Sequence, residues 1–402
     1  MTFLSPKLQC IASGFRPEFG IYVHVPFCAQ RCGYCTFNTY TRTDWGMDFS
    51  LSTYADWVGR EINMAVAQSS RLPTVNTVYF GGGTPTLLPV ADLAFILNKL
   101  RQVFPFQPDC EISTEANPDS LCQEDVDNLA QAGFTRLSLG MQSAVPAVLK
   151  RLNRTHQPER VEQVLSWAAQ AGLATSVDLI YGTPGETLDD WQYSVEQALS
   201  YQVKHISAYA LTLSGKTSMA YAIRKKLMPP IDEDDLVDKY YLADSLFRQA
   251  GLPWYEISNW AADGAQCQHN LIYWRSGQWW GFGPGAHSAM ANRRWHNKRH
   301  PMAWASDLRC GNLPLSGEIV VPPRSLAFEF LMSGIRLAEG IDLAYLAKHA
   351  PVGPDDLAIY RQRVSVLVDD GLLVTEPSSP DRVRLSDRGR MLADTVVRNL
   401  SL

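Results

Sequence analysis

Short runs of β-branched and other apolar residues alternate with longer amphipathic stretches from Ile21 to Tyr209. The predicted strands are Ile21–Val25, Thr77–Phe80, Glu111–Glu115, Arg136–Leu139, Ser176–Ile180 and His205–Tyr209. The predicted helices between them are Ser52–Ala67, Ala91–Val103, Gln123–Ala132, Pro158–Ala171 and Leu188–Ser200. This alternation is typical of βαβ units with right-handed crossovers on a parallel sheet. The predicted fold class is therefore α/β, and six such units fit either an open doubly wound sheet or a partial barrel.

The pattern changes after Thr212. Residues 216–248 have helical periodicity with a break at Pro229-Pro230, and residues 254–258 are expected to form one more strand. The run CQHNLIYWRSGQWWGFGPGAHS is rich in glycine and aromatic residues, and it matches neither a periodic helix nor a long strand. Pro322-Pro323 then predicts a boundary, beyond which the chain is regular again.

The C-terminal part is expected to contain three helices and a hairpin. The helices are residues 325–336, 342–348 and 355–369, and the strands are residues 371–375 and 382–385. Ser386 is suited to cap a last helix. Three helices with a hairpin resemble a winged-helix module, and many such modules bind DNA. Because this segment carries no dense basic stripe, a docking or lid role is favoured.

Composition narrows the class of protein further. The chain has 402 residues with 46% hydrophobic content, which is enough for a large core in more than one domain. A net charge of −5 disfavours a general nucleic-acid or anionic-membrane binder. The first twenty residues contain no long apolar run, and no segment approaches the ~20 apolar residues of a membrane span. The expectation is a cytoplasmic protein without stable membrane insertion, and eight cysteines suit a reducing compartment.

Three cysteines stand close together directly after the first predicted strand, in the run HVPFCAQRCGYCTF. Cys28, Cys32 and Cys35 have C-x3-C-x2-C spacing, which suits a [4Fe–4S] cube with one iron left without a protein ligand. The alternatives are buried thiols or a structural zinc knuckle, although zinc sites usually show four ligands in paired spacing. The spacing resembles that of the radical S-adenosylmethionine (SAM) superfamily, in which the open iron holds the amino and carboxylate groups of SAM.

Polar and glycine residues follow the later predicted strands. The loop GGGTPT at residues 81–86 lets the backbone approach a ligand closely, and it is not a P-loop because no G-K-[ST] follows. Glu115, Gln142, Arg154 and Asp178 stand at or just beyond successive strand ends. Such ends meet at one mouth of a barrel, so we expect these side chains to converge. Each alone is an ordinary rim residue, but together with the cysteines they favour a SAM site.

The segments YVHVPFC, GGGTPT, EISTEANP, FTRLSLGMQS, RLNR and VDLIYGTPGE resemble the oxygen-independent coproporphyrinogen III oxidase family over residues 20–213. The resemblance implies a partial (β/α)6 barrel that holds a [4Fe–4S] cluster and SAM. The positions that match the family's cluster ligands are Cys28, Cys32 and Cys35. The positions that match its SAM-binding residues are Tyr22, Tyr34, Gly82, Gly83, Thr84, Glu115, Gln142, Arg154 and Asp178.

Two branches of this family are candidates: the oxidase of haem synthesis and the HemW-type haem chaperones. The oxidase continues its cysteine motif as C-x3-C-x2-C-x-C, whereas Phe37 stands at the fourth position here. The oxidase also has a longer N-terminal extension than the twenty residues that precede the first predicted strand. Both departures favour the chaperone branch.

The run HNLIYW at residues 269–274 resembles the HNxxYW signature of the haem chaperones. Imidazole is a common axial ligand of haem iron, and aromatic rings can stack on the macrocycle. The expected haem-binding residues are His269 as the leading ligand, Asn270, Tyr273 and Trp274. An isolated motif of this kind is more often a core histidine among packed aromatic side chains. His287 and Cys267 are the alternative ligands.

The expected function is that of a chaperone that binds haem and transfers it to an acceptor apo-haemoprotein, such as a respiratory enzyme. SAM would either be cleaved at the cluster or act as a structural ligand that gates homodimer formation or haem transfer. One alternative is a coproporphyrinogen III oxidase of porphyrin biosynthesis. Another is a radical SAM enzyme acting on nucleic acid, which the acidic charge disfavours.

The resemblance and the pattern together predict four domains. These are an N-terminal segment (1–20), a radical SAM partial barrel (21–213), an aromatic-rich extension with the haem motif (214–321), and a winged-helix-like C-terminal domain (322–402).

Overall fold

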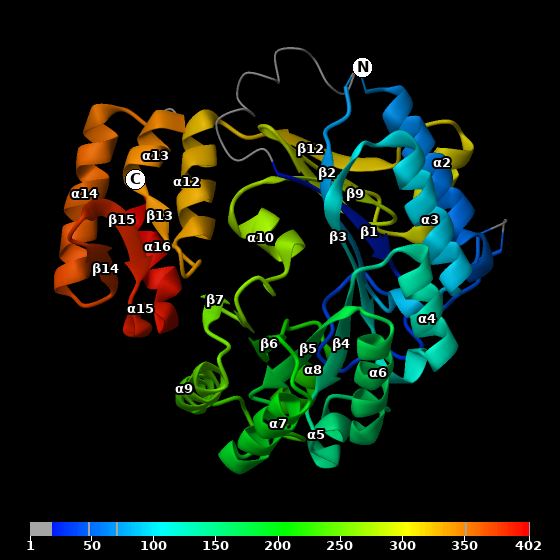
Figure 1. Ribbon diagram of the computed structural model, residues 1–402, viewed down its shortest axis with the longest axis horizontal. Coiled ribbons are helices and arrows are strands. Elements are labelled where there is room, and N and C mark those ends of the chain that lie inside the picture. Colours follow the sequence, from blue (N-terminus) through cyan, green and yellow to red (C-terminus); the bar gives the residue numbers. More distant parts are fainter. Residues whose placement is uncertain (1–17, 47–48, 70, 350–351, 402) are drawn as a thin grey trace.

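A curved sheet, parallel in its middle and antiparallel toward both ends, forms the centre of the molecule (Figure 1). The computed structural model describes residues 18–46, 49–69, 71–349 and 352–401, so the predicted N-terminal segment lies outside it except for its last three residues. In these ranges twelve strands pair in the order β12-β11-β10-β9-β1-β2-β3-β4-β5-β6-β8-β7. The six parallel strands expected from the sequence are β1 (Phe19–Val25), β2 (Val75–Gly82), β3 (Phe106–Ala116), β4 (Arg136–Gln142), β5 (Ala174–Tyr181) and β6 (His205–Ala210). The predicted α/β class is confirmed, and the strand order ends at two edges instead of closing.

Helices connect these strands and pack side by side outside the sheet, where Figure 1 shows α2, α3 and α4 in sequence along one flank. They are α2 (Tyr54–Ala67), α3 (Val90–Val103), α4 (Gln123–Ala132), α5 (Pro146–Arg151), α6 (Pro158–Gln170) and α7 (Leu188–Ser200). Three 3₁₀ turns lie at Leu51–Thr53, Pro85–Leu87 and Pro118–Ser120. Local chemistry explains such bounds. Thr187 Oγ1 accepts from the Asp190 N–H at 3.1 Å, and Asp190 Oδ2 accepts from the Thr187 N–H, so α7 begins at Leu188.

The strand β1 shows how alternation divides the core from the site. Ile21, Val23 and Val25 are fully buried in the main hydrophobic core. Tyr22 and His24 alternate with them and therefore point to the opposite, concave face of the sheet. Alternate side chains of β1 thus pack in the hydrophobic core, while those between them place polar groups on the concave face.

The extension after β6 is more regular than its sequence predicts. It contains α8 (Ser218–Arg224), α9 (Glu233–Gln249), β7 (Trp254–Glu256), β8 (Asn259–Ala261), α10 (Gln268–Trp274), β9 (Gln278–Phe282), β10 (His287–Met290), β11 (Arg293–Asn297), α11 (Pro301–Arg309) and β12 (Leu315–Val320). The run that matches neither a periodic helix nor a long strand forms the short helix α10 and the short strand β9, which the sequence did not predict. The reason is tertiary, because β9 pairs in parallel with β1, with Gly281 opposite Tyr22.

The C-terminal part has its own hydrophobic cluster. It contains α12 (Pro323–Gly334), β13 (Ile341–Asp342), α13 (Leu343–His349), α14 (Pro354–Asp369), β14 (Leu373–Glu376), β15 (Ser379–Leu385), α15 (Asp387–Met391) and α16 (Ala393–Leu400). A three-stranded sheet joins β13, β15 and β14, in keeping with the winged-helix-like expectation. The change of architecture falls between Val320 and Pro323, and the division into four domains stays a prediction. None of the described helices is long and apolar enough to cross a membrane.

Ion pairs join this C-terminal part to the extension. Arg390 on α15 donates to both carboxylate oxygens of Asp244 on α9, each at 2.8 Å, and the residue is 2% exposed. The same guanidinium lies 4.8 Å from the ring centre of Trp254. Arg275 forms a second link to Glu339 at 3.0 Å. Arg390 therefore holds α15 against α9, and the docking or lid role of this part stays a prediction.

The buried pair should be costly to break. Arg390→Met leaves the Asp244 carboxylate buried without its main cation, which typically costs about 3–5 kcal/mol. We expect a clear fall in the urea midpoint for α9 and the C-terminal part, followed by circular dichroism. The control is Arg361→Met, since Arg361 pairs with Asp381 on the exposed surface. Equal shifts in the two variants would contradict this assignment.

Candidate functional site

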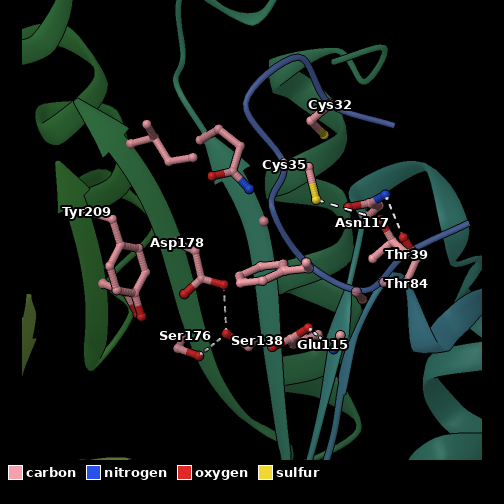
Figure 2. A pocket seen from close by; sticks show the side chains of 18 of the residues that line it. Cys32, Cys35, Thr39, Thr84, Glu115, Asn117, Ser138, Ser176, Asp178 and Tyr209 are labelled. Carbon is pink, nitrogen blue, oxygen red and sulfur yellow. Dashed lines mark hydrogen bonds between the residues drawn. The ribbon is translucent and has the colours of Figure 1, made fainter. Parts of the chain in front are cut away.

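One cavity of about 700 Å³ opens at the C-terminal ends of the parallel strands. Figure 2 shows side chains of β3, β4, β5 and β6 pointing into it from one side and the cysteine loop closing it from another. Fifteen of the sixteen sequence-predicted site residues line it: Tyr22, Cys28, Cys32, Tyr34, Cys35, Gly82, Gly83, Thr84, Glu115, Gln142, Arg154, Asp178, His269, Asn270 and Tyr273. The exception is Trp274. The fold therefore brings together residues that lie up to 251 positions apart, from Tyr22 to Tyr273.

The three cysteines lie in the loop that follows β1. All are free thiols, and the Arg154 guanidinium lies 3.7 Å from the Cys32 sulfur. Burial is the main cause that raises the pKa of Cys28 to about 11, so this thiol needs a cationic partner to ionise. In the described ranges no three such side chains converge on a single ion. A [4Fe–4S] cube does not require that, because each cysteine binds a different iron.

The glycine loop holds the cysteine loop against the sheet. The Gly83 N–H donates to the Val25 carbonyl at 2.8 Å, and the Thr84 N–H donates to the Phe27 carbonyl at 2.7 Å. A Cβ at Gly83 would lie 2.4 Å from the Phe27 oxygen, and Gly82 has a φ of +115°. Any larger residue would push the two loops apart. The glycines are therefore required by the close approach of the two backbones.

Two buried carboxyl groups face the cavity. Glu115 accepts from the Tyr79 hydroxyl at 2.9 Å and from the Gly82 N–H at 3.0 Å, yet burial raises its pKa to about 7. Asp178 accepts from the Ser138 hydroxyl at 2.9 Å, and burial raises its pKa too. A bound cation would favour the ionised form of both groups. SAM carries a sulfonium and an ammonium group, so the two carboxyl groups suit it as a ligand.

Arg154 connects the cysteine loop to the strand ends. It donates to the Gly140 carbonyl at 2.9 Å and to Asn117 Oδ1 at 2.8 Å. Gln142 follows a bulge at the end of β4 and adopts a left-handed backbone with φ of +63°. Such a conformation is uncommon outside glycine and costs free energy, so the bulge re-aims Gln142 at the cavity.

Several polar residues of this site were not predicted from the sequence. Asn117 also donates to the Thr84 hydroxyl at 3.2 Å, and it therefore joins the glycine loop to Arg154. Its signal was its position two residues after Glu115, within the EANP segment. The others are Thr39, Ser138, Ser176 and Tyr209 (Figure 2). Single serines and threonines carry no spacing signal, so only the fold identifies them.

The HNLIYW run forms α10 at the base of the cavity. His269 is 1% exposed, and its Nδ1 and Nε2 atoms are hydrogen-bonded to the Thr77 and Tyr273 hydroxyls at 2.7 and 2.8 Å. Burial lowers its pKa to about 3, so the ring is neutral at physiological pH. In this arrangement His269 presents neither nitrogen to an iron, which disfavours it as the leading haem ligand.

The other residues of the run have separate surroundings. Asn270 donates to the Tyr255 hydroxyl at 3.2 Å and to the Glu256 carboxylate at 3.1 Å. Trp274 lies outside the cavity and packs against the apolar cluster that contains Leu271 and Leu337. The alternative ligand Cys267 is buried and donates to Glu111 Oε1 at 3.6 Å. The helix thus turns Trp274 to neighbours other than those of His269 and Tyr273, and its expected haem contact stays a prediction.

Comparisons with known proteins agree with this site. A model of the radical SAM superfamily matches residues 22–198, and a model of the HemN C-terminal domain matches residues 321–392. The haem chaperone HemW of Mycobacterium tuberculosis is 43% identical over 383 residues, covering 95% of this chain and 94% of its own length. The chain belongs to the HemW family. HemW of Escherichia coli is 32% identical over 329 residues, covering 80% of this chain and 84% of its own.

A solved structure shows the same fold. The coproporphyrinogen III oxidase HemN of Escherichia coli superposes with a TM-score of 0.82, covering 100% of this chain and 94% of its own, at 21% identity. At that identity the likeness establishes the fold alone. The predicted resemblance to the family, and within it to the HemW branch, is confirmed by the relatives.

The cysteine set should be required for a cluster. We expect Cys32→Ala to lose the broad cluster absorbance after anaerobic reconstitution with iron and sulfide, because two thiolates cannot retain the cube. The matched control is Cys310→Ala, which removes an exposed cysteine outside the cavity lining. Full cluster content in the Cys32 variant would sink the assignment.

The buried Glu115 should make SAM binding depend on pH. With a pKa of about 7 it loses its charge as pH falls, so a cationic ligand should bind about tenfold more weakly at pH 6 than at pH 8. Calorimetric titration of the reconstituted protein measures this, with cluster absorbance checked at each pH. Glu115→Gln should bind more weakly and lose the slope. An affinity in the wild type that stays constant from pH 8 to pH 6 would argue against this role.

Proposed function

We propose that this chain is a haem chaperone that binds haem and transfers it to an acceptor apo-haemoprotein. The observation that carries the proposal is the likeness to HemW along nearly the whole chain, at 43% identity. The HemW proteins of Mycobacterium tuberculosis and Escherichia coli are named haem chaperones. The chain also retains an exposed Phe37 at the position two residues after the last cysteine of the motif.

The proposed cofactor site uses the cavity at the strand ends. Cys28, Cys32 and Cys35 would hold a [4Fe–4S] cluster, with Arg154 offsetting the charge beside Cys32. The residues proposed for SAM are Tyr22, Tyr34, Gly82, Gly83, Thr84, Glu115, Gln142, Arg154 and Asp178. When bound, the cluster and SAM supply one-electron chemistry or a conformational signal; the side chains orient the ligand and exclude water.

The size of the cavity separates the two ligands. About 700 Å³ is the volume that encloses a single drug-sized molecule, and SAM is of that size. A haem cannot share this space with SAM, so we place the haem outside the cavity. Surface binding suits a protein that hands its cargo to another protein, because release needs no large opening.

The helix α10 has a different proposed role. His269 on α10 is hydrogen-bonded to Thr77 on β2 and to Tyr273 on its own helix. Its ring stacks on the ring of Tyr79, with centroids 5.1 Å apart. Tyr79 in turn bonds to Glu115. We propose that the motif closes the base of the cavity and positions Glu115, which explains a histidine whose two nitrogens are both used internally.

The decisive experiment combines haem binding with an oxidase assay. The reconstituted protein should bind haemin with a Soret band and pass it to apomyoglobin as a model acceptor. With SAM and a reductant it should form no protoporphyrinogen from coproporphyrinogen III, as judged by mass spectrometry. Product formation without haem binding would make the chain an oxidase instead.

Haem binding should also survive loss of the cluster. Because the haem is placed outside the cavity, Cys32→Ala should titrate with haemin as the wild type does, with Cys310→Ala as the matched control. A loss of haem binding confined to the Cys32 variant would show that the two ligands share one site.

A further inference from the structure

Two histidines face each other on the part of the sheet beyond the cavity. His287 on β10 lies directly opposite His296 on the antiparallel strand β11. Their ring centroids are 5.1 Å apart and the planes make an angle of 73°. His287 is exposed, and neither residue lines the cavity. The strand register thus produces an imidazole pair that no sequence spacing would suggest.

The pair is incompletely satisfied. The Nδ1 atom of His296 is buried and has no hydrogen-bond partner in the described part of the chain. An unpaired buried polar atom is unfavourable, so its retention calls for an explanation. Burial lowers the pKa of His287, and the neighbouring His296 and Arg299 lower it further. A neutral imidazole is the form that ligates metals.

A glycine lies beside each of the two histidines, on the neighbouring strand. A Cβ at Gly281 would lie 2.3 Å from the His287 carbonyl oxygen, and a Cβ at Gly317 would lie 2.8 Å from His296 Cε1. Gly281 is on β9 and Gly317 is on β12, so the two glycines lie on the strands that flank β10 and β11. Without a Cβ at these positions, the His287 backbone and the His296 ring can lie close against the neighbouring strands.

Apolar and cationic groups border the same area. Ile319, 63% exposed, lies opposite Arg294, which stands two residues from His296 and so shares its face. Phe37, which lines the cavity beside the cysteines, is 66% exposed. The neighbour of Phe37, Asn38, donates to the carbonyls of Pro284 at 3.0 Å and Arg299 at 2.9 Å, which holds the cysteine loop beside β10 and β11.

The ligand set favours haem over a bare metal ion. A transition metal ion usually takes three or four protein ligands, but the described residues contain no group of three histidine, cysteine or acidic side chains suited to one ion. Haem iron already has four porphyrin nitrogens and needs only an axial ligand. Exposed apolar side chains and an arginine beside an imidazole complement a flat apolar ring with carboxylate tails.

We propose that His287, oriented by the edge-on ring of His296, is the axial ligand of haem on the open face of β10 and β11. Ile319 contacts the porphyrin, and Arg299 pairs with a propionate. This inference rests on the proposed haem-chaperone function and deepens it by assigning the haem site. It also explains why His269, which is fully bonded at the cavity base, is not needed as a ligand.

The test compares four alanine variants and His287→Gly in the full-length reconstituted protein, titrated with haemin. His287→Ala should shift the Soret band and weaken haem binding by more than about tenfold. His296→Ala should weaken haem binding about tenfold, because the His287 ring then lacks the neighbour that orients it. His269→Ala and His300→Ala should keep the wild-type spectrum; His300 is exposed and caps α11. Added imidazole should restore the wild-type Soret position in His287→Gly.

The outcomes separate this inference from the proposed function. If the wild type binds haemin and His287→Ala binds it with the same spectrum and affinity, the assignment to His287 fails while the chaperone proposal stands. A spectral loss confined to His269→Ala overturns it in favour of the residue that the sequence indicated. If the wild type binds no haemin, the proposed function itself fails. Circular dichroism of each variant shows that the loss is not one of folding.

Discussion

The close approach of the glycine loop to the loop after β1 is the constraint on which the site depends. Two backbone hydrogen bonds, from Gly83 to Val25 and from Thr84 to Phe27, hold the cysteine loop over the strand ends. There is no space for a Cβ at Gly83, so the contact is possible only with glycine there. The positions of the three thiols, of Arg154 beside them and of Glu115 on the Gly82 N–H all follow from this contact.

Electrostatics give the cavity its preference for a ligand. Its carboxyl groups are buried and have raised pKa values, while its nearest cation, Arg154, is turned to the cysteine loop and to Asn117. Such a site gains from a cationic ligand that restores the charge of Glu115 and Asp178. The polar interior thus costs stability in the empty protein and contributes to binding, as is common where function competes with folding.

The extension changes what the barrel can do. By pairing β9 with β1 it makes β1 an interior strand, and by continuing through β10, β11 and β12 it adds a second open face beside the cysteine loop. Asn38 contacts both regions, because it follows the cysteines and bonds to Pro284 and Arg299. The cofactor cavity and the proposed haem face are therefore neighbours with a shared border. The C-terminal part is joined to the extension by the ion pair of Arg390 on α15 with Asp244 on α9.

Much of the barrel could be predicted from the sequence alone. Helix α7 was bounded without error and β6 to within one residue, because capping residues and apolar periodicity act within a few positions of the chain. The cysteine spacing and the polar residues at the strand ends indicated the site, since parallel strands place their C-terminal ends together. The tertiary structure alone decided the rest. The parallel pairing of β9 with β1, the bond of His269 to Thr77, the turn of Trp274 away from the cavity and the facing of His287 and His296 depend on strand register between segments far apart in sequence. Local pattern contains no information on such pairing, because its free energy comes from partners that the chain meets only once it has folded.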